Sequence, residues 1–394
     1  MNRAALRVAV VGAGIGGLAA AFALRREGIE ATVYEQAGEL REVGVGMHLA
    51  PNGSRIVHRW GLGAALDRVA VRPAALEVRD WTSGRTLFRQ PMGAVWEQEF
   101  GAPHYTVHRA DLHRLLADRL PQGAVRLGRR LVSHADDGER VRLTFADGTT
   151  AQADVLVGAD GVHSIVRRAL LGTQVPAFSG SSAFRGLVSF DRVPGLPRDT
   201  MYIWVGARSR LLAYPVGRAT LTFVCVVPDP GWRLESWSAP GDPDDLAAAT
   251  AGGNPDIAAI ASHAPTFAGL RRWALYDREP APTWGDGRVT LLGDAAHPML
   301  PHHGQGVSQA LEDAVALAHH LAAAPGEPAE ALRRYAQLRR PHTADVQLGS
   351  RGGGSLRLRP DGSTSDGGAL PSLVEDVSWI HRYDVAAELL AATA

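Results

Sequence analysis

The chain has 394 residues, 45% of them hydrophobic, and its 41 basic and 41 acidic residues balance. This length allows a large core, and we expect two closely connected domains. The even charge argues against nucleic acid or an anionic membrane surface as a partner, and no apolar run is long enough to span a bilayer. With one cysteine, Cys225, and no N-terminal signal run, we expect no intrachain disulfide and a cytoplasmic location.

Every basic side chain apart from histidine is an arginine, because the sequence contains no lysine. A Schiff-base lysine for pyridoxal phosphate and the lysine of a P-loop are therefore both excluded. No metal site is predicted. Any phosphate must be bound by backbone amides and arginines.

The first predicted unit, over residues 7–35, is a strand, a helix and a second strand. An apolar strand ends in Gly12-Ala13-Gly14-Ile15-Gly16-Gly17, and an Ala/Leu-rich helix follows. Gly12 allows the tight turn, Gly14 lets the backbone approach a pyrophosphate, and Gly17 lets the helix pack on the strand. The pyrophosphate would lie at the helix N-terminus. Glu35, at the end of the second strand, is placed to accept hydrogen bonds from an adenosine ribose.

The middle of the chain changes character along its length. Residues 54–66 are amphipathic, residues 76–89 are typical of a β-hairpin, and Asp111 to Leu120 has the spacing of a helix. Strand-like runs over 124–158 end at Asp160-Gly161. A separate antiparallel sheet is predicted over 178–228, followed by a helix over 243–262.

A second glycine-rich turn lies about 280 residues after the first. The strand Val289 to Leu292 leads into Gly293-Asp294, and a long helix is predicted from Gln305 to Ala324. The two turns, with Asp160-Gly161 between them, indicate a chain that folds back on itself to hold FAD. A second helix follows over 328–348, then a Gly/Ser/Asp-rich link over 352–369 and a short C-terminal piece with Trp379 and Tyr383.

These motifs, in this order, resemble those of the class A flavoprotein aromatic hydroxylases, the single-component FAD monooxygenases. The resemblance covers roughly residues 7–345 and is nearest to the salicylate and 3-hydroxybenzoate hydroxylase branch. It implies an α/β fold, with a Rossmann-like FAD-binding domain, an inserted antiparallel-sheet substrate domain and C-terminal helices. The FAD-binding domain would comprise residues 1–75, 105–177 and 275–350. The substrate domain would comprise 76–104 and 178–274, and 351–394 would form a C-terminal loop and helix.

The resemblance also assigns roles to residues that bind the cofactor. Asp294 matches the position that holds the ribityl and pyrophosphate region of FAD, Arg109 matches an arginine that reaches the same region, and Asp160 is associated with both FAD and NAD(P)H. Gly304-Gln305-Gly306, preceded by Pro301, matches the loop beside the pyrimidine edge of the isoalloxazine. A helix starting there would place its positive dipole end near the negative charge of reduced flavin. A plain helix cap is the alternative for the two glycines.

On the substrate side, the resemblance points to Tyr214, a pocket tyrosine at the end of a strand. Several relatives carry a histidine four residues earlier, where this chain has Arg210. This difference argues against a catalytic base of the salicylate hydroxylase type. The substrate could instead be anionic or otherwise different, or another part of the chain could supply the base. His302 and His303 precede the flavin loop, and His302 is our candidate for contact with the ring. Arg185 would either pair with a carboxylate or be structural, and His104 is expected to belong to the scaffold.

The implied reaction uses tightly but non-covalently bound FAD, NADH or NADPH, and O2. It hydroxylates a small phenolic or heteroaromatic molecule through a C4a-hydroperoxyflavin. The alternative is an FAD-dependent reductase, desaturase or epoxidase acting on a polycyclic or prenyl substrate. The substrate ring and the choice between monomer and homodimer stay open at this point.

Overall fold

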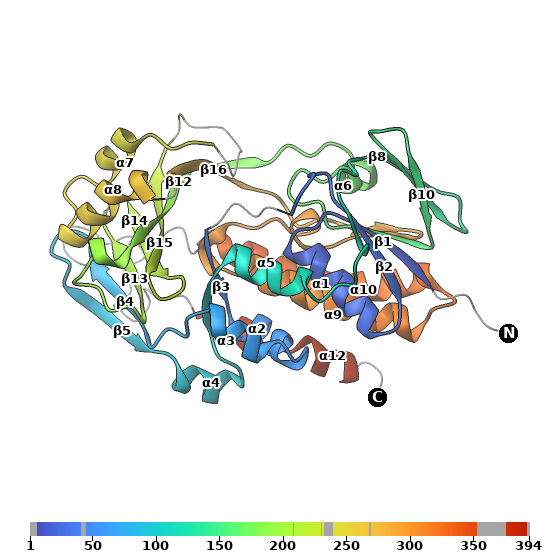
Figure 1. The fold of residues 1–394 in the computed structure, drawn as a ribbon, viewed down its shortest axis with the longest axis horizontal. Helices are drawn as coiled ribbons and strands as arrows, with labels where there is room; N and C mark the ends of the chain where they lie inside the picture. Colours follow the sequence, from blue (N-terminus) through green and yellow to red (C-terminus); the bar gives the residue numbers. More distant parts are fainter. Residues whose placement is uncertain are drawn as a thin grey trace.

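The computed structural model describes residues 6–40, 45–207, 209–229, 231, 239–267, 269–352 and 376–391. Figure 1 shows two sheets at opposite ends of an elongated molecule, with long helices between and beneath them. The predicted link over 352–369 lies outside the described residues, apart from residue 352 at the end of a helix. None of the helices in these ranges combines the length and apolar character that crossing a bilayer requires.

The six-stranded sheet is the nucleotide-binding half of the fold. Its order is β17-β18-β11-β1-β2-β7, parallel except where β17 meets β18. The strands are β1 (Arg7–Val11), β2 (Glu30–Tyr34), β7 (Val125–Arg126), β11 (Val155–Gly158), β17 (Gly285–Asp286) and β18 (Val289–Leu291). The central strands β1 and β11 are almost wholly buried. Helices α1 (Ile15–Arg26), α9 (Gly306–Ala323) and α10 (Pro328–Gly352) pack together beside it.

The seven-stranded sheet forms the other half, in the order β16-β12-β15-β14-β13-β4-β5. All neighbours are antiparallel except β4 and β13. The strands are β4 (Ala75–Asp80), β5 (Thr86–Pro91), β12 (Ala177–Ser189), β13 (Thr200–Val205), β14 (Arg210–Pro215), β15 (Thr220–Pro228) and β16 (Arg271–Asp277).

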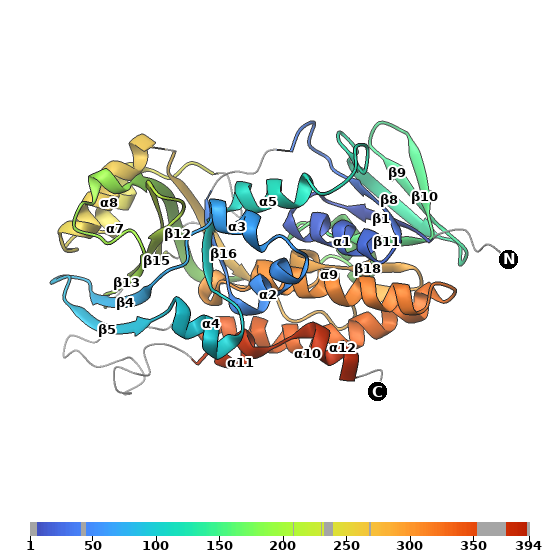
Figure 2. The same cartoon turned by 60° about the horizontal axis from the view of Figure 1, so that its bottom comes forward.

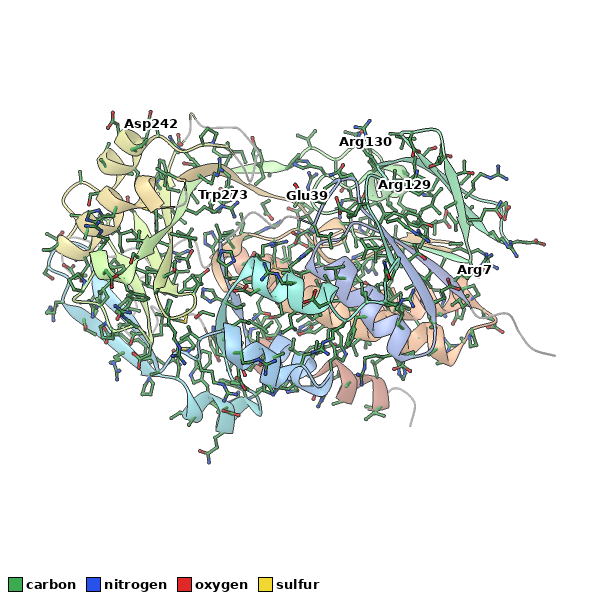
Figure 3. The ribbon with its side chains drawn as sticks, viewed as in Figure 1. Arg7, Glu39, Arg129, Arg130, Asp242 and Trp273 are labelled. Carbon is green, nitrogen blue, oxygen red and sulfur yellow. The ribbon has the colours of Figure 1, made fainter. Side chains whose placement is uncertain are left out.

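The two faces of this sheet differ in what covers them. Helices α7 (Pro243–Ala249) and α8 (Pro255–Phe267) cover the outer face, over an apolar core that includes Phe184 and Phe223. The inner face is turned toward the six-stranded sheet, and Trp273 of β16 lies on it against Leu300 (Figure 3). This inner face is therefore the one that can present side chains to a bound nucleotide.

Smaller elements join the two halves. A β3–β6 pair lies near the junction, and a three-stranded sheet of β8, β9 and β10 flanks the nucleotide half. The elements are β3 (Gly46–Leu49), β6 (Tyr105–His108), β8 (Leu131–Asp136), β9 (Val141–Phe145), β10 (Thr150–Ala153), α2 (Pro51–Arg59), α3 (Gly63–Val69), α4 (Ala94–Phe100), α5 (Arg109–Ala117) and α6 (Ile165–Leu171), with three 3₁₀ turns at η1 (Phe190–Arg192), η2 (Gly293–Ala295) and η3 (Pro301–His303). Figure 2 shows α11 (Ser378–Arg382) and α12 (Val385–Ala391) running along α10, with α11 close to α4.

The predicted α/β fold class is confirmed, whereas one amphipathic stretch and one predicted helix each divide into two helices. The stretch 54–66 falls in α2 and α3, which are separated by Gly61 at a φ of 76°. The helix predicted over 243–262 is split by Gly252 at a φ of 74°. Glycine at positive φ ends a helix at little steric cost. The division into domains at the stated boundaries stays a prediction.

Candidate active site

Four predicted cofactor residues meet at one edge of the six-stranded sheet. Gly12 follows β1, Glu35 follows β2, Asp160 follows β11, and Gly293-Asp294 follows β18. All four strands are parallel, so their carboxyl ends lie together, which is where open α/β sheets bind ligands.

The first glycine-rich turn has the geometry that a pyrophosphate needs. A Cβ on Gly12 would lie 2.4 Å from the Ala159 carbonyl oxygen, and one on Gly17 would lie 1.9 Å from the Gly12 carbonyl oxygen. These two glycines are required by the packing of the chain itself. A Cβ on Gly14, in contrast, meets nothing within 4 Å. Gly14 also begins α1, whose N-terminus has no side-chain cap and no acidic residue in its first turn. The amides there are therefore open to an anion.

The two acids at this edge also hold the local backbone. Glu35 accepts hydrogen bonds from the Ala13 and Ala37 amides, each at 2.8 Å, so its carboxylate lies against the glycine-rich turn. Asp160 accepts hydrogen bonds from Ser164 Oγ and from the Ile165 amide, and burial raises its pKa. Asp160 therefore anchors the start of α6, a structural task that the sequence motif does not reveal.

The predicted flavin loop lies between η3 and α9. Pro301 begins η3, and Gly304 ends it at a φ of 63°. Gln305 is 1% exposed and begins α9 without a side-chain cap. Gly306 approaches the exposed Asp294, whose Oδ1 would lie 3.8 Å from a Cβ added there. The amides at the start of α9 thus face the same edge as Asp294.

A buried polar network supports this loop from below. Asn52 Nδ2 donates to Gln305 Oε1 at 3.0 Å and to Glu312 Oε1 at 2.6 Å. Arg339 pairs with Glu312 at 2.7 Å and with Asp313 at 2.9 Å. Burial raises the pKa of Glu312 to about 7, against the opposing effect of Arg339.

The same network reaches the second glycine-rich turn. Asp313 Oδ2 accepts from the Gly293 amide at 3.1 Å and lies 2.6 Å from His297 Nε2. Although burial acts to raise the pKa of Asp313, His297 and Arg339 outweigh it and lower that pKa. These contacts tie α9, α10 and the Gly293 turn into one rigid support.

The features at this edge fit FAD. The open Gly14 backbone and uncapped α1 suit a pyrophosphate, Glu35 suits a ribose, and the uncapped start of α9 suits the electron-rich pyrimidine edge of a flavin. Arg109 begins α5, and its amide donates to the Val45 carbonyl at 2.9 Å beside β3. The assignment of individual atoms to Arg109, Asp160, Asp294 and Pro301 stays a prediction.

The inner face of the seven-stranded sheet carries the predicted substrate residues. Arg210 and Tyr214 lie on the same face of β14, four residues apart. Arg185 of β12 pairs with Val224 of β15, which in turn pairs with the β14 residue midway between them. At about 3.3 Å per residue, Arg210 and Tyr214 are therefore roughly 13 Å apart along the strand. The two candidates occupy different ends of one surface.

Arg210 is joined to His302. Its Nη2 donates to His302 Nδ1 at 2.7 Å. Burial, then the charge of Arg210, lowers the pKa of His302 to about 3. His302 is therefore neutral at pH 7, and one of its nitrogens is already engaged. A catalytic role for this pair stays a prediction.

Arg185 brings a buried positive charge near Tyr214. Arg185 is 7% exposed, its guanidinium lies 4.8 Å from the centre of the Trp273 ring, and burial lowers its pKa to about 10. Burial raises the pKa of Tyr214, and the charge of Arg185 lowers it by a smaller amount. Tyr214 therefore stays protonated at pH 7.

Two histidines in this region were not predicted from the sequence as site residues. The His48 ring meets Tyr214 edge-on at 4.2 Å between ring centres, and it also meets His104 at 5.6 Å. His104 was expected to be scaffold, yet neither of its buried nitrogens has a hydrogen-bond partner among the residues that the structure describes. The two meet because β3 pairs with β6, with His48 opposite Thr106. No local pattern signals a pairing between segments nearly 60 residues apart.

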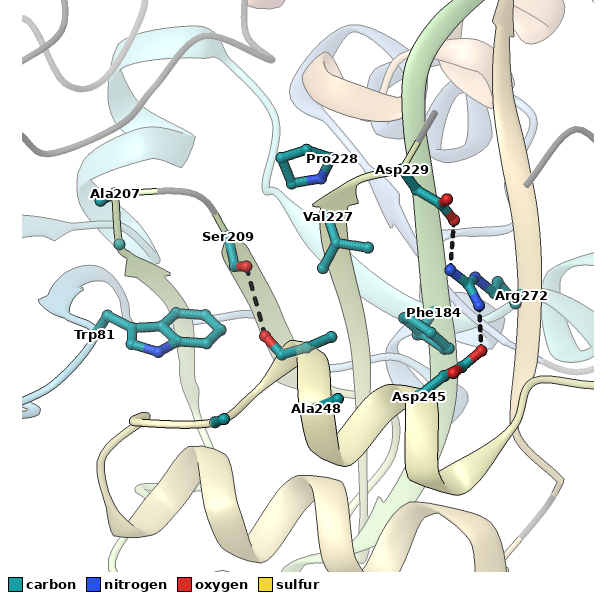
Figure 4. Close-up of a pocket in the computed structure, with 13 residues that line it drawn as sticks. Trp81, Phe184, Ala207, Ser209, Val227, Pro228, Asp229, Asp245, Ala248 and Arg272 are labelled. Atoms are coloured by element: carbon teal, nitrogen blue, oxygen red, sulfur yellow. Dashed lines mark hydrogen bonds and ion pairs between the residues drawn. The ribbon is translucent and has the colours of Figure 1, made fainter. Parts of the chain in front are cut away.

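A separate hollow lies on the other face of the seven-stranded sheet. Its volume is about 480 Å³, and Figure 4 shows it between α7 and the outer face of the seven-stranded sheet, beside Trp81 and Phe184. Arg272 bridges Asp229 and Asp245 at its rim (Figure 4). Because the outer face is turned away from β3 and the flavin loop, we do not assign the reaction to this hollow.

Comparison with known proteins agrees with this geometry. Residues 5–348 match the family described as FAD binding domain. The chain is 44% identical to a 3-amino-4-hydroxybenzoate 2-monooxygenase of Streptomyces platensis, over 96% of each chain. It is 36% identical to a 6-hydroxynicotinate 3-monooxygenase of Bordetella bronchiseptica, covering 98% of this chain and 97% of that one.

Solved structures give the same result. A salicylate hydroxylase in complex with its substrate superposes with a TM-score of 0.82 at 31% identity, covering 98% of both chains. Klebsiella pneumoniae HpxO, solved with FAD and uric acid, also has a TM-score of 0.82, at 29% identity, covering 98% of this chain and 95% of that one. The comparisons favour the monooxygenase over the reductase, desaturase or epoxidase alternative.

Proposed function

The chain belongs to the family of FAD-dependent monooxygenases described as FAD binding domain, and from this premise we propose that it hydroxylates a phenol that also carries a carboxylate. Two of the relatives support this substrate class, since they are named for 3-amino-4-hydroxybenzoate and 6-hydroxynicotinate. 3-Amino-4-hydroxybenzoate is the first candidate, because that relative is 44% identical over nearly the whole chain.

The observation that carries the proposal is the buried charge of Arg185 beside Tyr214. Arg109 and Arg271 also act on the pKa of Arg185 through their charges, so the region is positive. A carboxylate that binds there gains a charge-assisted hydrogen bond in a place with little water. A neutral phenol gains much less.

The phenol end of the substrate would face Tyr214 and His48. Tyr214 stays protonated and donates a hydrogen bond to the substrate oxygen. Burial lowers the pKa of His48 to about 4, so its imidazole is neutral at pH 7, and its buried Nε2 has no partner among the described residues. A neutral imidazole nitrogen can accept the phenol proton in a hydrogen bond, which makes the ring more electron-rich.

FAD, when bound, supplies hydride acceptance from NADH or NADPH and the activation of O2. The chain orients the flavin and the substrate and excludes water from them. The start of α9 stabilises negative charge at the flavin edge, and an apolar cluster keeps water from the reacting ring. The cluster comprises Met92, Trp96, Phe100, Leu187, Met201, Tyr214 and Val216.

The proposal is tested on the purified holoenzyme. We would follow NADH and NADPH oxidation with 3-amino-4-hydroxybenzoate, 6-hydroxynicotinate, 3-hydroxybenzoate and salicylate, and with phenol as the partner lacking a carboxylate. Stimulation by one acid, with a hydroxylated product and little peroxide, is the expected result. Equal stimulation by phenol would contradict the carboxylate requirement, and no stimulation by any acid would reject the substrate class.

Two further assignments belong to the proposal. A cytoplasmic location follows from the need for reduced nicotinamide and from the single cysteine, Cys225, which is buried. The enzyme acts on small molecules as a monomer or homodimer, and light scattering of the purified protein distinguishes the two.

A further inference from the structure

The C-terminal segment, residues 376–391, is attached firmly to helix α2. The match to the family model ends at residue 348, before this segment. Arg55 of α2 donates to the main-chain oxygens of Tyr383 at 2.8 Å and His381 at 3.3 Å. Arg59 forms a two-bond pair with Asp384, at 2.5 and 2.6 Å.

The side chain that this attachment holds in place is His381. It is 4% exposed, and its ring packs against Trp96 and Phe100 at 5.1 and 5.2 Å between ring centres. The next ring along is His104, at 6.4 Å. His381 therefore closes the end of a row that runs through His104 and His48 to Tyr214.

The three histidines of this row are uncharged at pH 7. Burial lowers the pKa of His48 and of His381 to about 4, and it lowers that of His104 well below its usual value. A neutral imidazole offers one N–H donor and one acceptor nitrogen. Buried polar atoms are nearly always paired in folded proteins. Both nitrogens of His104 and Nε2 of His48 lack a partner within the described part of the chain, so they can exchange hydrogen bonds with a polar group of a ligand that reaches this row.

We propose that the C-terminal segment forms a wall of the substrate pocket, and that His381 is a specificity-determining residue. Together with His48 and His104 it receives an uncharged hydroxyl or amino substituent of the aromatic ring. Such a group both donates and accepts hydrogen bonds, which matches neutral imidazoles. A carboxylate does not match them and belongs beside Arg185. The ligand part of this inference rests on the proposed function.

The ligand part is tested by binding to the holoenzyme. Dissociation constants of 3-amino-4-hydroxybenzoate and of benzoate are measured by equilibrium dialysis for wild type and His381→Leu. The substitution keeps an apolar wall and removes the nitrogens. We expect binding of 3-amino-4-hydroxybenzoate to weaken about five- to tenfold, the effect of losing one neutral hydrogen bond, and benzoate to change less than twofold.

Trp379→Leu is the matched control, because Trp379 lies in the same helix but is 43% exposed. It is expected to leave both constants within twofold of wild type. An equal loss for both ligands in His381→Leu, or no loss for either, would overturn the role of His381.

The wall itself is tested without any substrate. The rate at which diethyl pyrocarbonate modifies His104 in the holoenzyme is mapped by peptide mass spectrometry. Asp384→Ala removes the pair with Arg59 and is expected to raise that rate several-fold, whereas Asp376→Ala, in the same segment but exposed, should not. Asp384→Asn, the milder change, is measured beside it in case the alanine variant fails to fold.

An unchanged rate in a folded Asp384 variant would refute the wall. Should the wild type bind none of the aromatic acids, the proposed function fails, while the wall still stands or falls on the rate of His104 modification.

Discussion

At the scale of single residues, the proposed substrate class depends on the buried charge of Arg185. Arg185 lies among apolar neighbours of β12 and β15, where an arginine keeps its charge despite burial. A carboxylate that binds beside such a charge gains a charge-assisted hydrogen bond in a place with little water. Under the proposed function, the carboxylate of the aromatic acid would bind there.

Replacing Arg185 by methionine is therefore expected to weaken the binding of 3-amino-4-hydroxybenzoate by about 10- to 100-fold, since one hydrogen bond to a charged group is lost. The binding of 2-aminophenol, the same ring without its carboxylate, should change little. Arg198→Met, at an exposed site on the same half of the molecule, is the control. Equal loss for both ligands, measured by equilibrium dialysis, would assign Arg185 to structure alone.

His48 is expected to affect the chemical step. His48→Leu removes the acceptor nitrogen beside Tyr214 while keeping similar bulk. We expect kcat to fall about tenfold to a hundredfold, with a smaller change in KM, because polarising the phenol matters most in the transition state. Rapid-reaction measurements should show flavin reduction by NAD(P)H at the wild-type rate. A change confined to KM would contradict this role.

At the scale of elements, different glycines of the turn before α1 serve chain packing and cofactor binding. Gly17→Ala places a Cβ 1.9 Å from the Gly12 carbonyl oxygen, so α1 must move away from β1. We expect a loss of about 3 kcal/mol or more in the free energy of unfolding, measured with urea on the apoprotein.

Gly14→Ala is the matched variant, since its Cβ meets no protein atom within 4 Å. We expect its apoprotein to be as stable as wild type within about 1 kcal/mol. Its affinity for FAD, measured by flavin fluorescence, should fall at least tenfold, because the added methyl occupies the approach to the pyrophosphate. Wild-type affinity in Gly14→Ala would contradict the placement of FAD at this turn.

The cofactor residues of the nucleotide half could be predicted from the sequence because each is marked by a local motif. Gly12, Glu35, Asp160 and Asp294 each come within three residues of the end of a strand, and parallel strands bring their carboxyl ends to one edge. The pairing of β3 with β6 has no local signal, so His48 could not be connected with His104. Likewise, the docking of His381 depends on side chains of α2 that are more than 300 residues away in the chain.

For the whole molecule, the buried neutral histidines determine the response to acid. An unfolded imidazole has a pKa of about 6.5, whereas the folded values are about 4 for His48 and His381 and about 3 for His302 and His342. Between pH 6.5 and 4 the unfolded chain therefore binds more protons, and stability is lost as the pH falls. Glu312, with a pKa near 7, acts in the opposite direction, as do Asp160 and Asp256, whose pKa values burial also raises. The four histidines outnumber these acids.

We therefore expect the free energy of unfolding, measured with urea, to fall steadily between pH 6.5 and pH 4.5. His48→Asn should reduce that slope by up to about 1.4 kcal/mol per pH unit, the value for one proton. A variant with the wild-type slope would show that His48 is not held neutral by the fold.

The central claim is that this chain couples O2 and reduced nicotinamide to ring hydroxylation. The most direct measurement is a turnover under ¹⁸O2 with 3-amino-4-hydroxybenzoate, with NAD(P)H consumed, peroxide formed and product mass determined together. The account predicts one ¹⁸O atom in the product for each NAD(P)H oxidised, with little peroxide. Oxidation of NAD(P)H that yields only peroxide, or a product without the label, would contradict it.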